Sequence, residues 1–551
     1  MNEVPPLPGP TGAPTMEPLL DVHDIQGNIL AGFNKDYQTL LALKIRDVAS
    51  ARKWLSRILP DINSTAEVHQ FNELFRLRRK RLKRDPDGLI ATWANIAFTH
   101  SGLSLLASPE EADSIPDEAF KIGLNKDRAG GFNDPLAPGE TDPTKGWAVG
   151  GTDHPLDILL IVASDSPRRL AAAVRKLRPK SEDGRRAPKV VWKESGATRP
   201  DLPGHEHFGF KDGVSQPGIR GLVSQQPPAF LTRRVLEPAP AGEVEFSKPG
   251  QPLVWPGQFV FGYPETNGSS DGGGSAQEPN PALPALAKNG SLLVFRRLYQ
   301  DVARFFAFLR EQAAEVAKNP AFAEMAPERL GALLVGRWPS GAPIERAPLT
   351  DNPDLGNDTL ANNDFLFAND TPAPAFLPGS PVPRKTFPPA RDDTNGNVCP
   401  HAGHIRKMNP RDQDSDKGDQ FDTLTRRILR RGIPYGAPFK SDAAGDDGVD
   451  RGLHFLCYQT SIVKQFETLQ QDWANNINAP KPLGHDLIIG QVDPTIPGTP
   501  RICELITPGG VSVNVTASQQ FVIPKGGAYC FAPSLTVLHQ LAQPRPAGPA
   551  A

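Results

Sequence analysis

The feature of this sequence that most constrains its fold is a repeated pair of segments: an apolar run of strand length, followed directly by a segment with helical periodicity. The pairs are 39–45 with 48–59, 89–98 with 101–108, 156–164 with 166–177, 291–298 with 300–317, and 452–460 with 461–476. Their spread over both halves predicts an α+β fold of sheets covered by helices, for which two similar modules are one arrangement. A doubly wound parallel sheet is the alternative, but no strand runs into the G-x-G-x-x-G turn of a dinucleotide-binding fold.

The size and charge of the chain favour small-molecule partners. Its 551 residues can form two domains or one large one, with a core big enough to bury a cofactor. The 60 Lys and Arg residues nearly balance the 62 Asp and Glu residues, so no global field attracts nucleic acid or a membrane, and we expect neither as a partner. The basic run 76–84 is a local exception, which we interpret as the solvated face of a helix or strand.

The ends of the chain and its cysteines carry little functional signal. The Pro-rich segments 1–17 and 543–551 are predicted to be disordered tails. The four cysteines are too few and too scattered to form a disulfide framework. Because neither a secretory signal nor an apolar run of about 18 residues is visible, the default expectation is a cytoplasmic protein without a membrane span.

The stretch CPHAGHIRKMNPRD, residues 399–412, places His404 among residues suited to holding a buried metal or cofactor. A metal-bound imidazole needs a hydrogen-bond partner on its second ring nitrogen, and Asn409 is a candidate. Arg411 is a nearby cation that could meet a cofactor carboxylate. Taken alone the stretch is ambiguous, because Cys399, His401 and His404 also have spacings that a zinc site could use.

Three other segments carry residues that could do chemistry. In GHEHFGFKDGVSQP, residues 204–217, Asp212 lies in a glycine-rich turn that lets the backbone approach a ligand closely, although an ordinary Asx-turn is the alternative. In RRILRRGIPYG, residues 426–436, one of the adjacent Arg430 and Arg431 can face a cavity while the other faces water. In the strand 452–459, Leu453 and Phe455 share one face, which an ordinary core strand would also explain.

Together these residues fit the cleavage of peroxide at a ferric haem. That reaction needs a group that moves a proton between the two peroxide oxygens and a cation that stabilises the developing negative charge. Asp212 can shuttle the proton and Arg430 can supply the charge, in a dry pocket lined by Leu453 and Phe455. Because the reference pKa of a carboxyl is about 3.9, against about 6.5 for histidine, we expect activity to be greatest in acid.

The sequence resembles the dye-decolorizing peroxidases in their longer form. The blocks that carry the resemblance follow in family order and span about 24 to 540. They are DIQGNILAGF (24–33), GFKDGVSQP (209–217), NGSLLVFRRLYQDVARFFAFL (289–309), GRWPSGAP (336–343), NDFLFANDT (363–371), CPHAGHIRKMNPRD (399–412), RRILRRGIPYG (426–436) and GLHFLCYQTSIVKQFETLQQDWANN (452–476).

The resemblance implies a haem peroxidase that reduces hydrogen peroxide and oxidises organic donors, such as dyes and phenolics, by one-electron steps. It makes His404 the iron ligand, with Asn409 as its partner, and it matches Asp212, Arg430, Leu453 and Phe455 to the distal side of the haem. Pairing of Arg411 with a haem propionate is our extension from charge. His401 departs from the family pattern. Of the two histidines, His404 is favoured as the iron ligand, because it alone lies in the HIRKMNPR stretch.

The implied fold is a pair of tandem ferredoxin-like modules with antiparallel sheets covered by helices, which would hold non-covalent haem b mainly in the C-terminal module. We expect the modules at 18–225 and 226–542. The absence of C-x-x-C-H agrees with haem that is not covalently attached. A haem-binding or iron-releasing protein without turnover is the alternative function, and a zinc hydrolase using Cys399, His401 and His404 is a more distant one.

Overall fold

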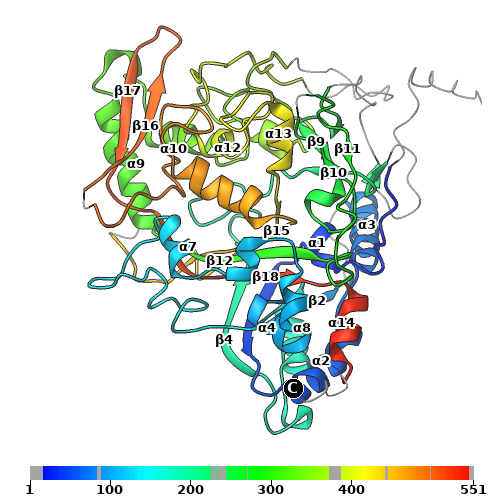
Figure 1. Ribbon diagram of the computed structural model, residues 1–551. Coiled ribbons are helices and arrows are strands. Elements are labelled where there is room, and N and C mark those ends of the chain that lie inside the picture. Colours follow the sequence, from blue (N-terminus) through cyan, green and yellow to red (C-terminus); the bar gives the residue numbers. More distant parts are fainter. Residues whose placement is uncertain are drawn as a thin grey trace, which may run out of the picture.

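The first half of the chain forms a β-α-β-β-α-β unit, which covers the lower part of Figure 1. Its elements are β1 (Tyr37–Lys44), α2 (Val48–Ile58), β2 (Thr92–Phe98), β3 (Ile158–Ser164), α8 (Pro167–Leu177) and β4 (Lys189–Ala197). The strands pair antiparallel in the order β4-β1-β3-β2. This order and connectivity make a ferredoxin-like module.

The second half repeats the same unit. Its elements are β12 (Ser291–Gln300), α9 (Val302–Val316), β14 (Ile433–Tyr435), β15 (Gly452–Gln459), the π-helix η5 (Ile462–Ala474) and β18 (Val522–Ala532). The strands pair antiparallel in the order β18-β12-β15-β14. The predicted tandem ferredoxin-like modules are therefore confirmed, and all five predicted pairs of strand and helix are present.

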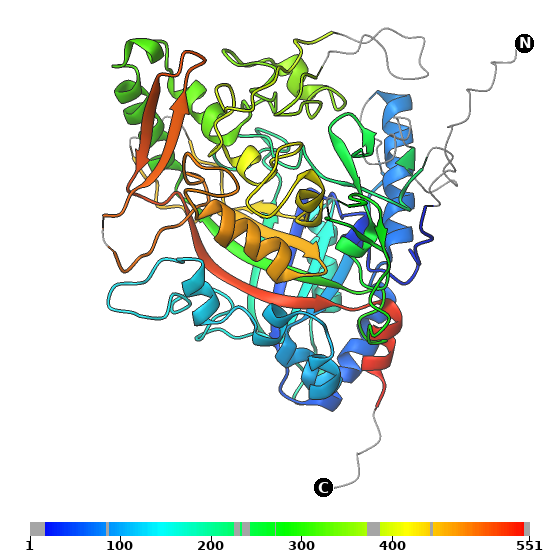
Figure 2. The ribbon, with the colours of Figure 1, turned by 45° about the horizontal axis from the view of Figure 1, so that its top comes forward.

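The two sheets join at both edges into one closed barrel. β14 meets β4 at Tyr435 and Gly196, and β18 meets β2 at Phe531 and Phe98. Closure removes the open edges that each four-stranded sheet would otherwise present. Figure 2 shows the long strand β18 curving past helix η5 toward the strands of the first half.

Alternate residues of the strands fill two apolar layers. On β1, Leu40 and Ala42 pack inside the barrel, whereas Leu41 and Leu43 pack under the helices of the first half. Both faces of β3 are likewise buried. Because both faces of these strands are covered, their sequences are continuous apolar runs and do not alternate between apolar and polar residues.

The remaining elements are insertions and connections. The computed structural model describes residues 17–83, 88–224, 232–233, 243–269, 271–371, 386–440, 445–496 and 498–544. The further helices are α1 (Gly27–Leu30), η1 (Leu59–Asp61), α3 (Thr65–Leu82), α4 (His100–Leu106), α5 (Pro109–Asp113), α6 (Glu118–Ile122), α7 (Lys126–Gly131), η2 (Ser181–Asp183), η3 (Pro256–Gln258), η4 (Pro320–Phe322), α10 (Pro327–Val335), α11 (Pro353–Asn357), α12 (His404–Lys407), α13 (Gln420–Thr425) and α14 (Leu535–Ala542). The further strands are β5 (Gly218–Ile219), β6 (Val223–Ser224), β7 (Thr232–Arg233), β8 (Phe246–Lys248), β9 (Gln251–Val254), β10 (Glu265–Thr266), β11 (Ala276–Gln277), β13 (Leu429–Arg430), β16 (Arg501–Ile506) and β17 (Ser512–Ala517).

Several predictions concern regions at the margin of the described ranges. The predicted tails lie outside them except for Glu17, Gln543 and Pro544, and so does the expected module boundary at 225–226. Residues 76–82 of the predicted basic run form the end of α3, where the described side chains are exposed, and residue 84 lies outside the described ranges. Every helix in the described part of the chain is too short or too polar to cross a lipid bilayer.

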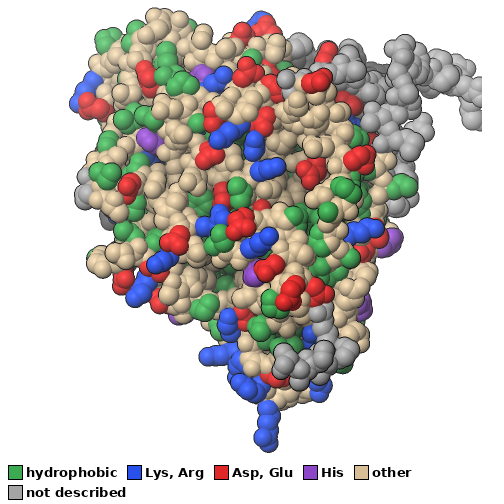
Figure 3. All heavy atoms as spheres, in the orientation of Figure 1, with side chains coloured by type: hydrophobic (Ala, Val, Ile, Leu, Met, Phe, Trp, Pro, Cys, Tyr) green, Lys and Arg blue, Asp and Glu red, His purple; other side chains and the backbone are tan. Residues whose placement is uncertain are grey.

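The surface carries acidic and basic side chains side by side over most of the face in Figure 3, as the balanced composition predicts. Lys and Arg gather only at the lower end of that view, below the region of α2 and α8. Arg175 and Lys176 lie in the last turn of α8, where basic side chains interact favourably with the helix dipole.

Candidate functional site

A cavity lies between the sheet of the second half and the segments that cover it. Its volume is about 320 Å³. Much of its wall is apolar and comes from β12, α10, α12, β15 and η5, through residues such as Leu298, Val335, Ile405, Leu453, Phe455 and Phe466. All seven residues singled out from the sequence line it: Asp212, His404, Asn409, Arg411, Arg430, Leu453 and Phe455.

Helix α12 presents His404 to this cavity. The helix is only four residues long, and its other polar side chains anchor it. Arg406 pairs with Asp393 at 2.8 Å, and Lys407 donates to the carbonyls of Ala479 and Gly484 at 2.6 Å each. Because these buried contacts hold the helix, the position of the imidazole is determined by the surrounding fold rather than by helix propensity.

The hydrogen-bond partner of His404 is Asp486, not Asn409 as the sequence predicted. His404 Nδ1 lies 2.7 Å from Asp486 Oδ2, and Asp486 is fully buried. The side-chain oxygen of Asn409 instead accepts the backbone N–H of Arg411. No local pattern marks Asp486, which lies 82 residues from His404 in sequence, so sequence reasoning could not pair the two.

The charge of this pair orients the imidazole. Burial would raise the pKa of Asp486, but His404 and the N–H groups of Ile488 and Ile489 outweigh it and hold that pKa below its usual value. Burial would lower the pKa of His404, but the Asp486 carboxylate raises it. With Nδ1 engaged, Nε2 has no hydrogen-bond partner among the described residues and is the nitrogen available to a metal.

Asp212 and Arg430 form an ion pair in the same cavity. Arg430 Nη1 donates to Asp212 Oδ1 at 2.7 Å, and Nη2 donates to the carbonyl of Ser215 at 2.9 Å. The side chains retain 42% and 31% of their exposure, and both line the cavity. The two residues lie 218 positions apart in sequence and meet because the loop that follows Asp212 contacts β13, where Gln216 Nε2 donates to the carbonyl of Arg430.

The carboxyl of Asp212 is held in its ionised form. The loss of solvent around the carboxyl in the cavity would raise its pKa, but the Arg430 guanidinium and the N–H of Gly213 outweigh this effect and hold the pKa below its usual value. The N–H of Gly213 lies 2.6 Å from Asp212 Oδ1, and Gly213 has φ 73°, a conformation that glycine adopts without strain. The turn thus provides a charged acceptor that faces the cavity.

The adjacent Arg431 has a different environment from the one predicted. Its guanidinium does not point to water but donates to the carbonyls of Asn28, Ile29 and Leu30 at the end of α1. These are carbonyl groups that a helix end leaves without partners. On β15 the prediction of two faces agrees with the contacts: Leu453 and Phe455 line the cavity, while Leu456 packs inside the barrel.

Three further arginines line the cavity without a carboxylate bonded to them in the described structure: Arg337, Arg411 and Arg427. Arg337 and Arg411 both donate to the side-chain oxygen of Asn363, at 2.9 and 2.7 Å. Nε of Arg427 is buried without a partner. Burial lowers the pKa of Arg337 and Arg427 to about 9 and that of Arg411 to about 10. The cavity therefore has excess positive charge.

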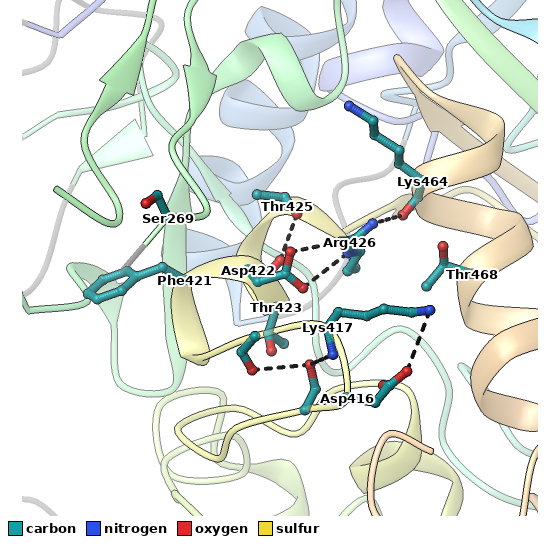
Figure 4. Close-up of polar contacts among 12 residues, drawn as sticks. Ser269, Asp416, Lys417, Phe421, Asp422, Thr423, Thr425, Arg426, Lys464 and Thr468 are labelled. Atoms are coloured by element: carbon teal, nitrogen blue, oxygen red, sulfur yellow. Dashed lines mark hydrogen bonds and ion pairs between the residues drawn. The ribbon is translucent and has the colours of Figure 1, made fainter. Parts of the chain in front are cut away.

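The neighbouring Arg426 shows the contrast. Figure 4 shows its guanidinium between Asp422 of α13 and the backbone of Lys464 on η5. Its Nη2 lies 2.7 Å from Asp422 Oδ1, so its charge is already neutralised by the protein. Lys417 is likewise paired, with Asp472 at 2.9 Å. The positive charge that lacks a bonded carboxylate among the described residues thus lies on Arg337, Arg411 and Arg427.

The zinc-site alternative is not supported. Within the described residues, no group of three His, Cys, Asp or Glu side chains could hold a metal ion. Cys399 and His401 are buried outside the cavity lining, and burial lowers the pKa of His401 to about 4. His205 and His207, which precede Asp212 in the same stretch of sequence, bond the backbone carbonyls of Pro339 and Tyr435.

An apolar cavity with excess positive charge and one available imidazole nitrogen fits an iron porphyrin bearing two carboxylates. The orphaned Nε of Arg427 is the most specific observation, because a buried donor without an acceptor is costly unless a ligand supplies one. The fold and the site together define the class: an α+β barrel enzyme with a haem-type cavity.

Comparison with known proteins places this class within a family. Residues 24–200 match the model described as "DyP dimeric alpha+beta barrel domain", and residues 350–483 match "Dyp-type peroxidase, C-terminal". A dye-decolorizing peroxidase of Mycena epipterygia is 32% identical over 98% of this chain and 90% of its own. The structure of an ancestral D-type dye decolorizing peroxidase is 34% identical with a TM-score of 0.72, over 95% of this chain and 99% of its own.

A fungal DyP-type peroxidase of Auricularia auricula-judae has a similar structure, with 29% identity and a TM-score of 0.69 over 95% of this chain and 99% of its own. The chain belongs to the dye-decolorizing peroxidase family. It is a peroxidase, and peroxidases of this family are haem enzymes that use hydrogen peroxide and organic reductants.

Proposed function

We propose that the cavity binds haem b non-covalently, with His404 as the iron ligand, and that Asp212 and Arg430 assist the reduction of hydrogen peroxide. The observation that carries this proposal is that His404 and the Asp212–Arg430 pair line one cavity. Asp486 orients the imidazole, while Leu453 and Phe455 close the apolar wall. Arg337, Arg411 and Arg427 are the candidates for pairing with the propionates, since they lack carboxylate partners in the described structure.

Bound haem would supply an iron atom that coordinates peroxide and the electrons that cleave its O–O bond. Asp212, ionised because of Arg430, accepts a proton from the incoming peroxide. The same carboxyl returns that proton to the departing oxygen, which leaves as water. Arg430 stabilises the negative charge that develops during cleavage, since its guanidinium is held in place by Asp212 and Ser215. Dyes and phenolics then serve as one-electron donors.

The test is the absorption spectrum of protein loaded with haem, recorded before and after stoichiometric peroxide and again after an organic donor. We expect a Soret band that changes with peroxide and is restored by two equivalents of a one-electron donor. Haem binding without peroxide-dependent oxidation of the donor would contradict the proposal and favour the alternative, a haem-binding or iron-releasing protein.

Arg427 provides an independent prediction about the cofactor. Arg427→Met removes a half-buried charge whose buried Nε has no partner among the described residues, so the cofactor-free protein should have a higher melting temperature. Affinity for haem should fall about 10-fold to 100-fold, because a hydrogen bond to a charged group contributes about 1.5–3 kcal/mol. Thermal unfolding and haem titration measure the two effects.

Arg426→Met is the matched control, since it leaves Asp422 without its partner. This variant should lower the melting temperature of the cofactor-free protein and change haem affinity little. Equal effects of the two substitutions on haem affinity would contradict the assignment of Arg427.

A further inference from the structure

Glu206 lies at the centre of the loop that presents Asp212. Its Oε2 accepts the N–H of Phe208 at 2.8 Å, and its Oε1 accepts the N–H of Phe210 at 2.9 Å. The backbone N–H of Glu206 also donates to the carbonyl of Phe210, and its carbonyl accepts the N–H of Gly209. The loop closes where Asp212 N–H donates to the carbonyl of Gly204. One carboxyl thus holds the turn that immediately precedes Asp212.

Gln300, the last residue of β12, ties this carboxyl to the barrel. Gln300 Nε2 lies 2.5 Å from Glu206 Oε2, a short contact between an amide and a carboxyl. Gln300 is 5% exposed, and its Oε1 has no hydrogen-bond partner. Turning the amide over would place this oxygen against Glu206, where a protonated carboxyl can donate to it. This contact can therefore form in either state of Glu206: Gln300 Nε2 donates to the ionised carboxyl, and Gln300 Oε1 accepts from the protonated one.

Glu206 lines the same cavity as Asp212, and these two carboxyls have different environments. Asp212 is paired with Arg430, whereas within the part of the chain that the structure describes the bonded donors of the Glu206 carboxyl are all neutral. Burial and the charge of Asp212 raise the pKa of Glu206 to about 7, although the N–H groups of Phe208 and Phe210 favour ionisation. The two environments thus shift the pKa values of the two carboxyls in opposite directions, which favours an ionised Asp212 beside a protonated Glu206.

The other charged groups near Glu206 are already engaged. Arg199 donates to the backbone carbonyl of Glu206, and its guanidinium pairs with Asp201 at 2.6 Å. Arg296 of β12 pairs with Asp134 at 2.6 Å, and His207 bonds the carbonyl of Tyr435. Lys211 donates to Gly356 and Asn357, and Asp301 interacts with Arg304.

We propose that Glu206 is a positioning residue for Asp212: its neutral carboxyl, bonded to Gln300, holds the loop 204–212 and keeps a second negative charge out of the cavity. This inference rests on the proposed function of Asp212. When Glu206 ionises, its negative charge repels the peroxide anion that forms as Asp212 takes the proton. The same charge raises the proton affinity of Asp212, so Asp212 returns that proton less readily to the departing oxygen. The rate constant for peroxide should therefore fall above about pH 7, on the order of threefold to tenfold.

Two substitutions separate the length of the side chain from its charge. Glu206→Gln keeps the length but cannot ionise, so the fall in rate above about pH 7 should disappear. Glu206→Asp keeps the ionisable group but is one methylene too short to accept from both Phe208 and Phe210. It should retain the fall in rate, lower the peroxide rate constant about tenfold by displacing Asp212, and speed amide exchange in 206–212.

Glu345→Gln is the matched control, because Glu345 is a buried glutamate with a raised pKa that does not line the cavity. It should leave the alkaline fall in rate intact. Infrared difference spectra of the cofactor-free protein provide a readout that needs no activity: a carboxylic-acid band that titrates near pH 7 should be absent from Glu206→Gln only.

The outcomes distinguish this inference from the proposed function. If haem-loaded wild type fails to react with peroxide, the proposed function fails, and the infrared and amide-exchange measurements still decide the role of Glu206. An alkaline fall that persists in Glu206→Gln would overturn the inference. Unchanged exchange of 206–212 in Glu206→Asp would overturn it as well.

Discussion

His404→Ala is expected to abolish retention of haem, whereas His401→Ala should leave haem bound. His404 lines the cavity and has Nδ1 committed to Asp486, so its Nε2 is available to iron. The ring of His401 is buried outside the cavity lining, where burial lowers its pKa to about 4. The ratio of haem to protein after gel filtration measures both variants directly.

The size of this effect follows from what the histidine supplies. On the proposed assignment, removal of His404 takes away the iron ligand and leaves apolar contacts and the arginines to hold the cofactor. It also leaves the Asp486 carboxylate buried without its partner. His404→Ala should therefore also lower the melting temperature of the cofactor-free protein. Loss of haem from His401→Ala with retention by His404→Ala would reverse the assignment.

Asp212→Asn should lower the second-order rate constant for reaction with peroxide by about 10²-fold to 10⁴-fold, the range typical of a lost general acid–base group. The amide keeps the size of the side chain but cannot accept the proton. Arg430→Met should cost about 10²-fold to 10³-fold, as for a lost electrostatic donor. Stopped-flow mixing of haem-loaded protein with peroxide measures both.

The pH dependence gives a second readout for Asp212. Arg430 holds the pKa of Asp212 below its usual value, so the base stays ionised as the pH falls through the range in which ordinary carboxyls protonate, near about 3.9. Activity should persist in acid and be lost only as the pH falls through the lowered pKa. Arg430→Met should move this acid limb to higher pH.

Asp493→Asn is a suitable control, because Asp493 also has a lowered pKa, through its bonds to Thr495, but is absent from the cavity lining. It should leave the rate constant and its pH profile unchanged. A rate that peaks in alkali, or an Asp212→Asn variant with the wild-type rate constant, would contradict the role of Asp212.

Much of the fold could be predicted from apolar runs, since the strands β1, β2, β3, β12 and β15 are buried on both faces or nearly so. Strand β4 was missed because most of its side chains are exposed or half-buried, and β14 was missed because it is only three residues long. Closure of the barrel could not be predicted, because each junction between the sheets is a single residue pair.

The candidate site likewise contains residues that could be predicted from the sequence and residues that could not. The seven predicted residues could be found from the sequence because each lies in a distinctive local stretch, and all seven line the cavity. Arg427 lies in the arginine-rich stretch 426–436 and could have been considered there, but nothing in the sequence separates it from Arg426. Their difference arises from Asp422, which neutralises one of them and not the other.

By itself the sequence determined the modules, the family resemblance and the chemistry available to Asp212, His404 and Arg430, because residue type and local periodicity are properties of short segments. Only the tertiary structure decided which groups meet: Asp486 rather than Asn409 at His404, α1 rather than water at Arg431, and Gln300 at Glu206. These contacts join residues far apart in the chain, so their geometry depends on how the two sheets close into one barrel.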